Sequence, residues 1–327
     1  MRPEAVVRAF VAAAALVVAA AYAAGLSAQE YPNRPIKVVV PYPPGGGTDV
    51  VARIVTQKMA TVLDATIVVD NRAGAGGNIG TEVVARSPAD GYTLLVATGS
   101  TTINNTLTPN LSWDLMRDFT PVVLLAWNQS VLVANPSFPA SSVTELIALA
   151  KAKPGQITYG SSGIGSSAHL WAELFKLKAG VDLTHVPYKG TAPAQTDLVS
   201  GQINVMFSDI SAALPFIKSG KMKALGVGSL TRFEGLPDVP TISESGVPGY
   251  EGGSVVGLVA PAGTPRNAIE TLNAAALKTL AAPEVRDRLL GLASVPAGGT
   301  ADEFSRRLRG EIDKWAQVIK TAGIKAE

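Results

Sequence analysis

Short runs of apolar, mostly β-branched residues alternate along this chain with longer stretches in which apolar residues recur every three or four positions. The short runs are apolar on both faces, which is typical of strands buried in parallel sheets. The longer stretches have the period of amphipathic helices. Strands that alternate with helices predict an α/β protein. The predicted strands are residues 36–40, 66–69, 92–97, 122–126, 131–134, 157–159, 183–186, 205–208, 224–227 and 254–259.

Two predicted helices begin with a hydroxyl residue and a glutamate three positions later, which is the pattern of a capping box. These pairs are Ser142 with Glu145 and Thr300 with Glu303. The second pair begins the last helix, whose apolar stripe predicts packing on a core. That stripe is formed by Phe304, Leu308, Ile312, Trp315 and Ile319. The first pair begins the predicted helix at 143–151, and the other predicted helices are residues 50–63, 79–85, 168–178 and 194–200.

The first 28 residues have the pattern of a secretory signal peptide. Arg2 and Arg8 precede an apolar run at 9–24, and small residues end the segment at Ala28. We therefore predict cleavage after Ala28 and export to the periplasm. An uncleaved membrane anchor is the alternative, but the run is alanine-rich and short for a membrane span.

Removal of this segment leaves 327 − 28 = 299 residues, a length at which chains usually divide into two domains. Loss of Arg2, Arg8 and Glu4 lowers the formal net charge from +2 to +1. A nearly neutral chain gives no reason to expect nucleic acid or an anionic membrane as a partner. The sequence contains no cysteine, which excludes disulfides, thiol catalysis and thiolate metal sites. We expect a monomer that uses no cofactor and no metal ion.

The residues that follow the first strand predict a rigid corner, a glycine loop and the start of a helix. Their sequence is Pro41-Tyr-Pro-Pro-Gly-Gly-Gly-Thr-Asp49. A glycine loop before a helix presents unpaired N–H groups and the positive end of the helix dipole, so an anion is expected there. No lysine follows the glycines, which excludes a nucleotide P-loop. We therefore predict that the anion is a carboxylate rather than a triphosphate.

A second glycine-rich loop, residues 160–169, lies between a predicted strand and a predicted helix. Gly163, Gly165 and Ala168 fit the G-x-G-x-x-A fingerprint of dinucleotide sites, and Asp182 has the spacing of the ribose ligand. The preceding strand is short and the flanks are rich in serine, which favours a small oxyanion over a dinucleotide. A helix-capping turn without any ligand is the alternative. With one such loop in each half of the chain, the two loops can face each other across a cleft.

A hydrolase requires a nucleophile beside a base. The sequence contains no G-x-S-x-G motif, and its two histidines are His169 and His185. We interpret both histidines as structural, and a hydrolase that uses one of them is the less favoured alternative. Asp209 ends a predicted strand, where α/β proteins bind ligands, so it is either a ligand contact or the N-cap of the following helix.

Several segments, in order along the chain, resemble a single family. They are residues 31–36, 40–49, 69–80, 87–94, 186–190, 201–204, 220–225, 236–241 and 246–250. Together they are similar to the Bug (TctC-like) extracytoplasmic solute receptors of tripartite tricarboxylate transporters. The resemblance extends over essentially the whole predicted mature chain.

This resemblance implies a type II periplasmic binding-protein fold, with two Rossmann-like lobes and a ligand cleft between them. On this basis we expect residues 29–129 to form lobe 1 and residues 130–252 to form lobe 2. Residues 253–327 are expected to return to lobe 1 and to end in the C-terminal helix.

The resemblance also implies a binding site for a small mono- or dicarboxylate, held by main-chain groups, hydroxyl groups and bridging waters from both lobes. The residues carried over from lobe 1 are Tyr42, Gly45, Gly46, Gly47, Thr48, Asn78, Thr98, Gly99 and Ser100. Those carried over from lobe 2 are Ser161, Ser162, Ser166, Ser167 and Asp209. The implied function is non-catalytic capture of the solute for the membrane subunits of a transporter. A ligand sensor that reports to a membrane signalling protein is the alternative.

Overall fold

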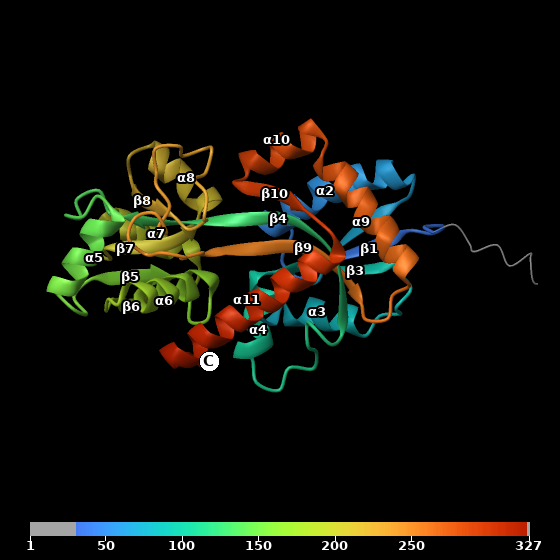
Figure 1. The fold of residues 1–327 in the computed structure, drawn as a ribbon, viewed down its shortest axis with the longest axis horizontal. Helices are drawn as coiled ribbons and strands as arrows, with labels where there is room; N and C mark the ends of the chain where they lie inside the picture. The colour runs from blue at the N-terminus through green and yellow to red at the C-terminus, as the bar shows by residue number, and fades with distance from the viewer. Residues whose placement is uncertain (1–30, 326–327) are drawn as a thin grey trace, which may run out of the picture.

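The computed structural model describes residues 31–325 and shows an elongated α/β protein with two lobes (Figure 1). Alternating strands and helices confirm the predicted fold class. The predicted signal peptide and its cleavage site lie outside the described residues. Within residues 31–325, no helix combines the length and the hydrophobicity that a bilayer crossing requires.

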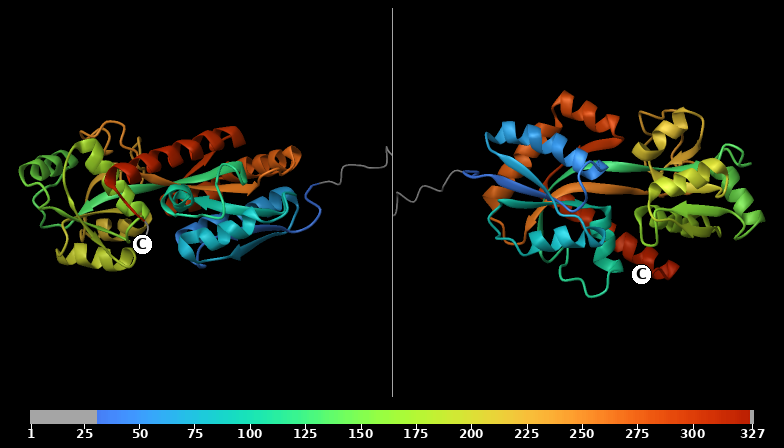
Figure 2. Two further views of the ribbon diagram at one scale, coloured as in Figure 1. Left: turned by 90° about the horizontal axis from the view of Figure 1, so that it is seen from below. Right: turned by 180° about the vertical axis from the view of Figure 1, so that it is seen from behind.

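All strands belong to one continuous sheet with the order β2-β1-β3-β9-β4-β7-β5-β6, and β8 and β10 also pair with β4. The strands of lobe 1 are β1 (Ile36–Val40), β2 (Ile67–Asn71), β3 (Thr93–Thr98) and β10 (Ser294–Gly298). Those of lobe 2 are β5 (Thr158–Ser161), β6 (Thr184–Pro187), β7 (Val205–Asp209) and β8 (Lys223–Val227). The long strands β4 (Phe119–Ala134) and β9 (Gly253–Pro261) lie side by side and connect the two lobes (Figure 2).

Two strand predictions need correction. Residues 122–126 and 131–134 are parts of the single strand β4, although the sequence shows polar residues between them. Two of these, Gln129 and Ser130, are buried, because they lie where the strand passes from one lobe to the other. β10 is missing from the prediction because Pro296 and the glycines that follow it resemble a loop.

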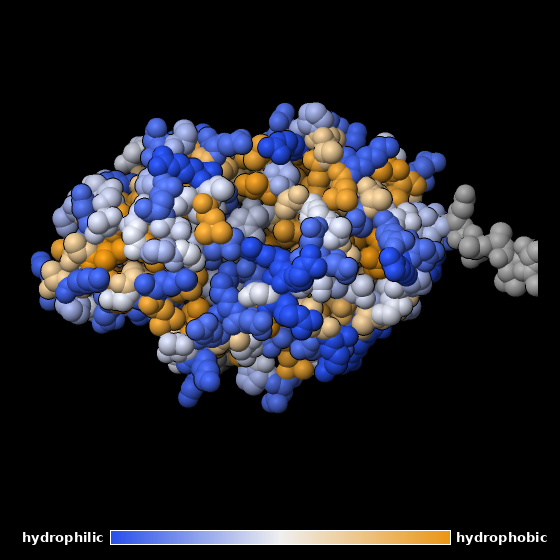
Figure 3. Space-filling view, viewed as in Figure 1, coloured by the Kyte–Doolittle hydropathy of each residue, from blue (hydrophilic) through white to orange (hydrophobic). Residues whose placement is uncertain are grey.

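The helices cover both faces of the sheet. Lobe 1 contains α2 (Gly47–Leu63), the short η1 (Ala75–Gly77), α3 (Asn78–Ala85), α4 (Gly99–Leu107), α9 (Arg266–Leu280) and α10 (Pro283–Gly291). Lobe 2 contains α5 (Val143–Ala152), α6 (Ser167–Ala179), α7 (Thr191–Ser200) and α8 (Ile210–Lys218). The last helix is α11 (Ala301–Ala322), and its outer surface is hydrophilic (Figure 3). Ser142 and Thr300 both cap their helices, because their hydroxyls accept hydrogen bonds from Glu145 N and Glu303 N. The capping box is confirmed at Thr300 but wrong at Ser142, where the Glu145 carboxylate accepts from Ser141 N at 2.7 Å instead.

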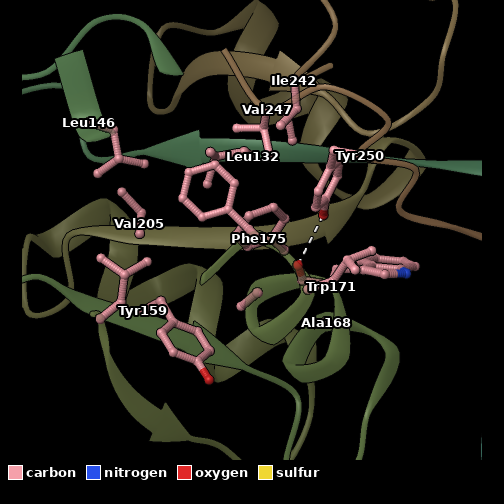
Figure 4. Packing of buried hydrophobic residues seen from close by; sticks show 14 of the residues in the cluster. Leu132, Leu146, Tyr159, Ala168, Trp171, Phe175, Val205, Ile242, Val247 and Tyr250 are labelled. Carbon is pink, nitrogen blue, oxygen red and sulfur yellow. Dashed lines mark hydrogen bonds between the residues drawn. The ribbon is translucent and has the colours of Figure 1, made fainter. Parts of the chain in front are cut away.

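α11 contributes to the cores of both lobes. Phe304 and Leu308, near its start, pack in a core cluster of lobe 1. Trp315 and Ile319, about two to four turns later, pack in a core cluster of lobe 2. Figure 4 shows the centre of that second cluster, where the Tyr250 hydroxyl donates to the Trp171 carbonyl oxygen at 3.0 Å.

The passage between the lobes is held by a contact among three backbone segments. Ser130 Oγ donates to Gly252 O at 2.7 Å. Gly228 N donates to Ser130 O at 2.7 Å, and Gly252 N donates to Gly228 O at 2.8 Å. The three segments approach so closely that a Cβ at residue 228 would lie 2.0 Å from Ser130 Oγ and 2.4 Å from Gly252 O. We call this arrangement the crossover contact.

The crossover contact predicts that Gly228→Ala destabilises the protein. The added methyl group meets backbone atoms that cannot move independently, and overpacking of this kind costs about 1–3 kcal/mol. We expect a fall in the melting temperature of several degrees. Gly310→Ala is the matched control, because Gly310 is exposed on α11 with no atom within 4 Å of an added Cβ. Equal melting temperatures for the two variants would contradict the crossover contact as a constraint.

Candidate functional site

The first glycine loop and the start of α4 leave the same edge of the sheet. β1 and β3 are adjacent parallel strands, so their carboxyl ends lie side by side. The loop after β1 carries Tyr42, and β3 ends at Thr98. The two side chains meet, with 2.8 Å between the Tyr42 hydroxyl and Thr98 Oγ1. Burial raises the pKa of the Tyr42 phenol, and hydrogen bonds with Ser100 and Thr98 partly offset this.

A second glycine-rich segment of lobe 1, residues 73–80, belongs to the same group. A Cβ at Gly77 would lie 3.4 Å from the Tyr42 hydroxyl, so this backbone is close to the ring. Asn78 begins α3, and its Oδ1 accepts a hydrogen bond of 3.0 Å from Asn104 Nδ2 on α4. The structure therefore brings Tyr42, Asn78, Thr98 and Ser100 together at one edge of lobe 1.

Asp49 fixes the shape of the first loop. Its side chain is only 3% exposed, and it accepts hydrogen bonds from Gly45 N at 2.9 Å and Asn71 Nδ2 at 2.9 Å. Arg53 Nε contacts both carboxylate oxygens, at 3.0 and 2.9 Å. Burial raises the pKa of the Asp49 carboxyl, but the bonds from Arg53, Gly45 and Asn71 outweigh it and lower the pKa overall. This network holds Gly45 at φ +83°, a conformation that favours glycine.

Sequence analysis did not identify Arg53 or Asn71 as part of this network. The i,i+4 spacing of Asp49 and Arg53 was a usable signal for the ion pair. Asn71 lies in β2 and reaches the loop only through the pairing of β1 with β2. It also donates to Tyr42 O at 3.0 Å, which joins both ends of the loop.

Some of the expected main-chain donors are already engaged by the protein. Gly45 N donates to Asp49, and Gly99 N donates to Ser254 Oγ at 3.0 Å. By contrast, α2 follows Gly46 with no side-chain cap, and its first residues are Gly47 and Thr48. The first N–H groups of a helix have no intrahelical acceptor. The start of α2 therefore keeps main-chain donors for another molecule.

In lobe 2 the second glycine loop joins β5 to α6. Ser161 is fully buried, and its Oγ lies 3.1 Å from both Gly163 N and Gly163 O and 2.7 Å from His185 Nε2. Ser166 caps α6 by accepting from His169 N at 3.3 Å. The remaining serines, Ser162 and Ser167, are partly exposed.

The two histidines lie behind this loop as a stacked pair. Their ring centroids are 4.0 Å apart and the rings are 11° from parallel. Gly165 N donates to His169 Nδ1 at 3.0 Å. Burial lowers the pKa of both histidines, and the neighbouring His169 lowers that of His185 further, to about 4.

The dinucleotide alternative for this loop does not fit the geometry. Gly155 N donates to Asp182 O at 3.2 Å, which places Asp182 beside the residues before β5. β6 runs parallel to β5, so Asp182 lies at the amino end of the strands, whereas the loop is at their carboxyl end. A ribose ligand in this fingerprint must lie at the carboxyl end.

Asp209 lies at the end of β7, opposite Ser130 in the neighbouring β4. It occupies the N-cap position of α8, but its side chain makes no capping hydrogen bond. The residue is exposed to solvent, although protein atoms surround it on several sides and raise the pKa of its carboxyl to about 6. Asp209 therefore lies next to the crossover contact.

α4 connects the surroundings of the two glycine loops, because Tyr42 of the first loop contacts Thr98 at the start of α4. α4 of lobe 1 packs against the second loop, where a Cβ at Gly165 would lie 2.3 Å from Leu107 Cδ2. A surface cavity of about 560 Å³ lies elsewhere, lined by residues of α9 and the start of α11 such as Arg266, Asn273 and Asp302. None of the predicted site residues lines that cavity, and its Arg266–Glu270 ion pair is exposed. We therefore place the candidate site at the loops.

Known proteins resemble this chain over nearly its whole length. Residues 51–324 match the family described as tripartite tricarboxylate transporter family receptor. BugT of Bordetella pertussis is 37% identical over 311 residues, which cover 94% of this chain and 95% of BugT.

Solved structures of similar proteins share the fold. The R. palustris protein Rpa4515 with adipate is 37% identical, with a TM-score of 0.77 over 90% of this chain and 99% of that chain. MatC from Rhodopseudomonas palustris with bound malate is 35% identical, with a TM-score of 0.73 over 88% of this chain and all of that chain (100%). The family match spans most of the sequence, and the structural matches include both lobes. The chain therefore belongs to the receptor family of the tripartite tricarboxylate transporters.

Proposed function

We propose that this protein is a periplasmic receptor that binds a small mono- or dicarboxylate between its lobes and delivers it to the membrane subunits of a tripartite transporter. The observation that carries the proposal is the uncapped start of α2, which follows the loop whose Tyr42 hydroxyl contacts Thr98. Similar proteins are named with adipate and with malate, which supports a carboxylic acid as ligand. In this proposal residues 1–28 are the signal peptide.

The proposed site would bind a carboxylate without an opposing basic side chain. α3 and α4 pack together at this edge, and α2 begins after the loop whose Tyr42 contacts Thr98 at the start of α4. The positive ends of helix dipoles favour an anion. Gly47 and Thr48 offer main-chain N–H groups, and Ser100 offers a hydroxyl. From lobe 2 we propose Ser162, Ser166, Ser167 and Asp209 as further contacts. Because the pKa of the Asp209 carboxyl is raised to about 6, this group can either donate a proton to a polar group of the ligand or accept one from it.

Closure of the lobes on the ligand is the proposed link to transport. Both connections, β4 and β9, are continuous strands, so a small change of twist at the crossover contact moves one lobe relative to the other. A ligand that contacts both lobes stabilises the closed arrangement. The same closure could report to a membrane sensor, which is the alternative role.

Catalysis is not part of the proposal. Ser161 Oγ and His185 Nε2 lie at the distance of a nucleophile–base pair, 2.7 Å. However, Ser161 has no exposed surface, and its hydroxyl also bonds with Gly163. A substrate carbonyl carbon cannot approach this oxygen in the observed conformation.

A thermal-shift screen tests the proposed function. We expect one acid in a panel that includes adipate and malate to raise the melting temperature by about 5–10 °C at a hundredfold excess over Kd. The matched control is the uncharged diamide of the same acid, which should give no shift. Absence of any stabilising acid, together with turnover of an ester, would contradict the receptor proposal.

The start of α2 gives a second test. We expect Gly47→Val to weaken binding of the identified acid by at least about tenfold, because the side chain covers the N–H groups at the helix start. The fold should be retained, since no atom lies within 4 Å of an added Cβ and φ is not in the glycine region. Gly310→Val on α11 is the control for the cost of valine in a helix. Unchanged affinity in calorimetric titration would show that this helix start does not bind the acid.

A further inference from the structure

We propose that His169 is a positioning residue, which holds the second glycine loop in its ligand-binding form only while its Nδ1 atom carries no proton, so that acidification releases the ligand. The inference rests on the proposed function, because it assigns a control to the lobe 2 half of that site. His169 lies on α6, behind the loop, and is 6% exposed. It therefore acts through the loop and not by contact with the acid.

The hydrogen bond from the loop fixes the protonation state of His169. Gly165 N lies 3.0 Å from His169 Nδ1, and a main-chain N–H can only donate. Nδ1 must therefore offer its lone pair, which places the ring proton of the neutral imidazole on Nε2. If Nδ1 were protonated, its N–H group and that of Gly165 would face each other as two donors without an acceptor. The loop would then lose its hydrogen bond at Gly165, directly before Ser166 and Ser167, which we propose as ligand contacts.

The second histidine makes the charged form still less favourable. His185 stacks on His169 at 4.0 Å, so two imidazolium rings would repel each other at close range. His185 also stacks on Tyr159 at 4.8 Å and bonds with Ser161 at the other end of the loop. The stacked rings thus support both ends of the loop from one side.

The carboxylate near the histidine pair, that of Glu173, already accepts hydrogen bonds from other residues. Glu173 Oε1 lies 4.0 Å from His169 Nε2, but it accepts the Tyr159 hydroxyl at 2.5 Å and Lys176 Nζ at 2.9 Å. The nearby Lys176 charge opposes protonation of both histidines. Glu173 favours protonation, but burial, the larger effect, lowers the pKa of His169 overall.

The other elements packed against α6 bring few charges toward the histidines. From β7, Phe207 packs on Phe175, and from β9 the Gly253 carbonyl accepts from Trp171. α4 contributes Leu107, which contacts Gly165. α11 carries Glu311 and Lys314, which pair with each other at 2.8 Å.

The sign of the pH effect follows from the lowered pKa values. A histidine whose folded pKa lies below its unfolded value of 6.5 stabilises the native arrangement fully above pH 6.5. That stabilisation falls as the pH drops below 6.5 toward the folded pKa, and for His185 the lower limit is about 4. The loop should therefore weaken between about pH 6.5 and pH 4.

The test compares three proteins in calorimetric titrations with adipate and malate from pH 8 to pH 4.5. His169→Asn keeps an acceptor, because Asn Oδ1 can take the place of Nδ1, but it cannot titrate. His169→Leu has no acceptor. As the pH is lowered, we expect the affinity of the wild type to fall with a slope that approaches tenfold per pH unit. We expect His169→Asn to bind with normal affinity at pH 8 and to show no such fall at lower pH. The titration of the acid itself affects both proteins equally and cancels in their ratio.

We expect His169→Leu to bind at least about tenfold more weakly at pH 8. Identical pH profiles for the wild type and His169→Asn would overturn the inference, whether or not His169→Leu folds. A wild type that binds no acid at any pH would instead contradict the proposed function. These two failures are distinguished by the wild-type titration at pH 8.

Discussion

The arrangement of this protein depends on the passage of two long strands from one lobe to the other. A strand that leaves one sheet must keep its N–H and C=O groups paired, because unpaired backbone groups inside a protein are costly. Here the crossover contact supplies the pairing through Ser130, Gly228 and Gly252, where no side chain larger than glycine fits at residue 228. The two glycine loops lie on opposite sides of this passage, because β1 joins the sheet through β3 and β9 whereas β5 joins it through β7 and β4.

The charged side chains near the first loop stabilise the loop itself, and the proposed ligand contacts there are main-chain groups. The Asp49 carboxylate is paired with Arg53 and also accepts hydrogen bonds from Asn71 Nδ2 and Gly45 N. The buried carboxylate is therefore internally compensated and does not repel an incoming acid as strongly as a free one would. This compensation makes the buried Asp49 compatible with the proposed anion site.

Much of the architecture could be predicted from the sequence, because strands and glycine loops are local patterns. The corner from Pro41 to Asp49 and the loop from Gly160 to His169 both lie where the sequence placed them, between a strand and a helix. The features that escaped prediction depend on distant partners. Asn71 reaches Asp49 only after β1 and β2 pair, and His185 reaches His169 only after β5 and β6 pair. The site roles of individual loop residues remain predictions.

The C-terminal helix has a mechanical consequence. Leu308 is fixed in one core and Trp315 in the other, and about 10 Å of straight helix separates them. A helix resists stretching and bending, so α11 keeps the distance between the two lobes fixed on the side of the protein where it lies. The lobes would then separate most easily on the side opposite α11, by rotation about an axis near this helix. In the proposed closure, the apolar side chains of α11 in the two cores would limit the amplitude of the motion. A change in their size would then alter affinity without contact with the proposed site.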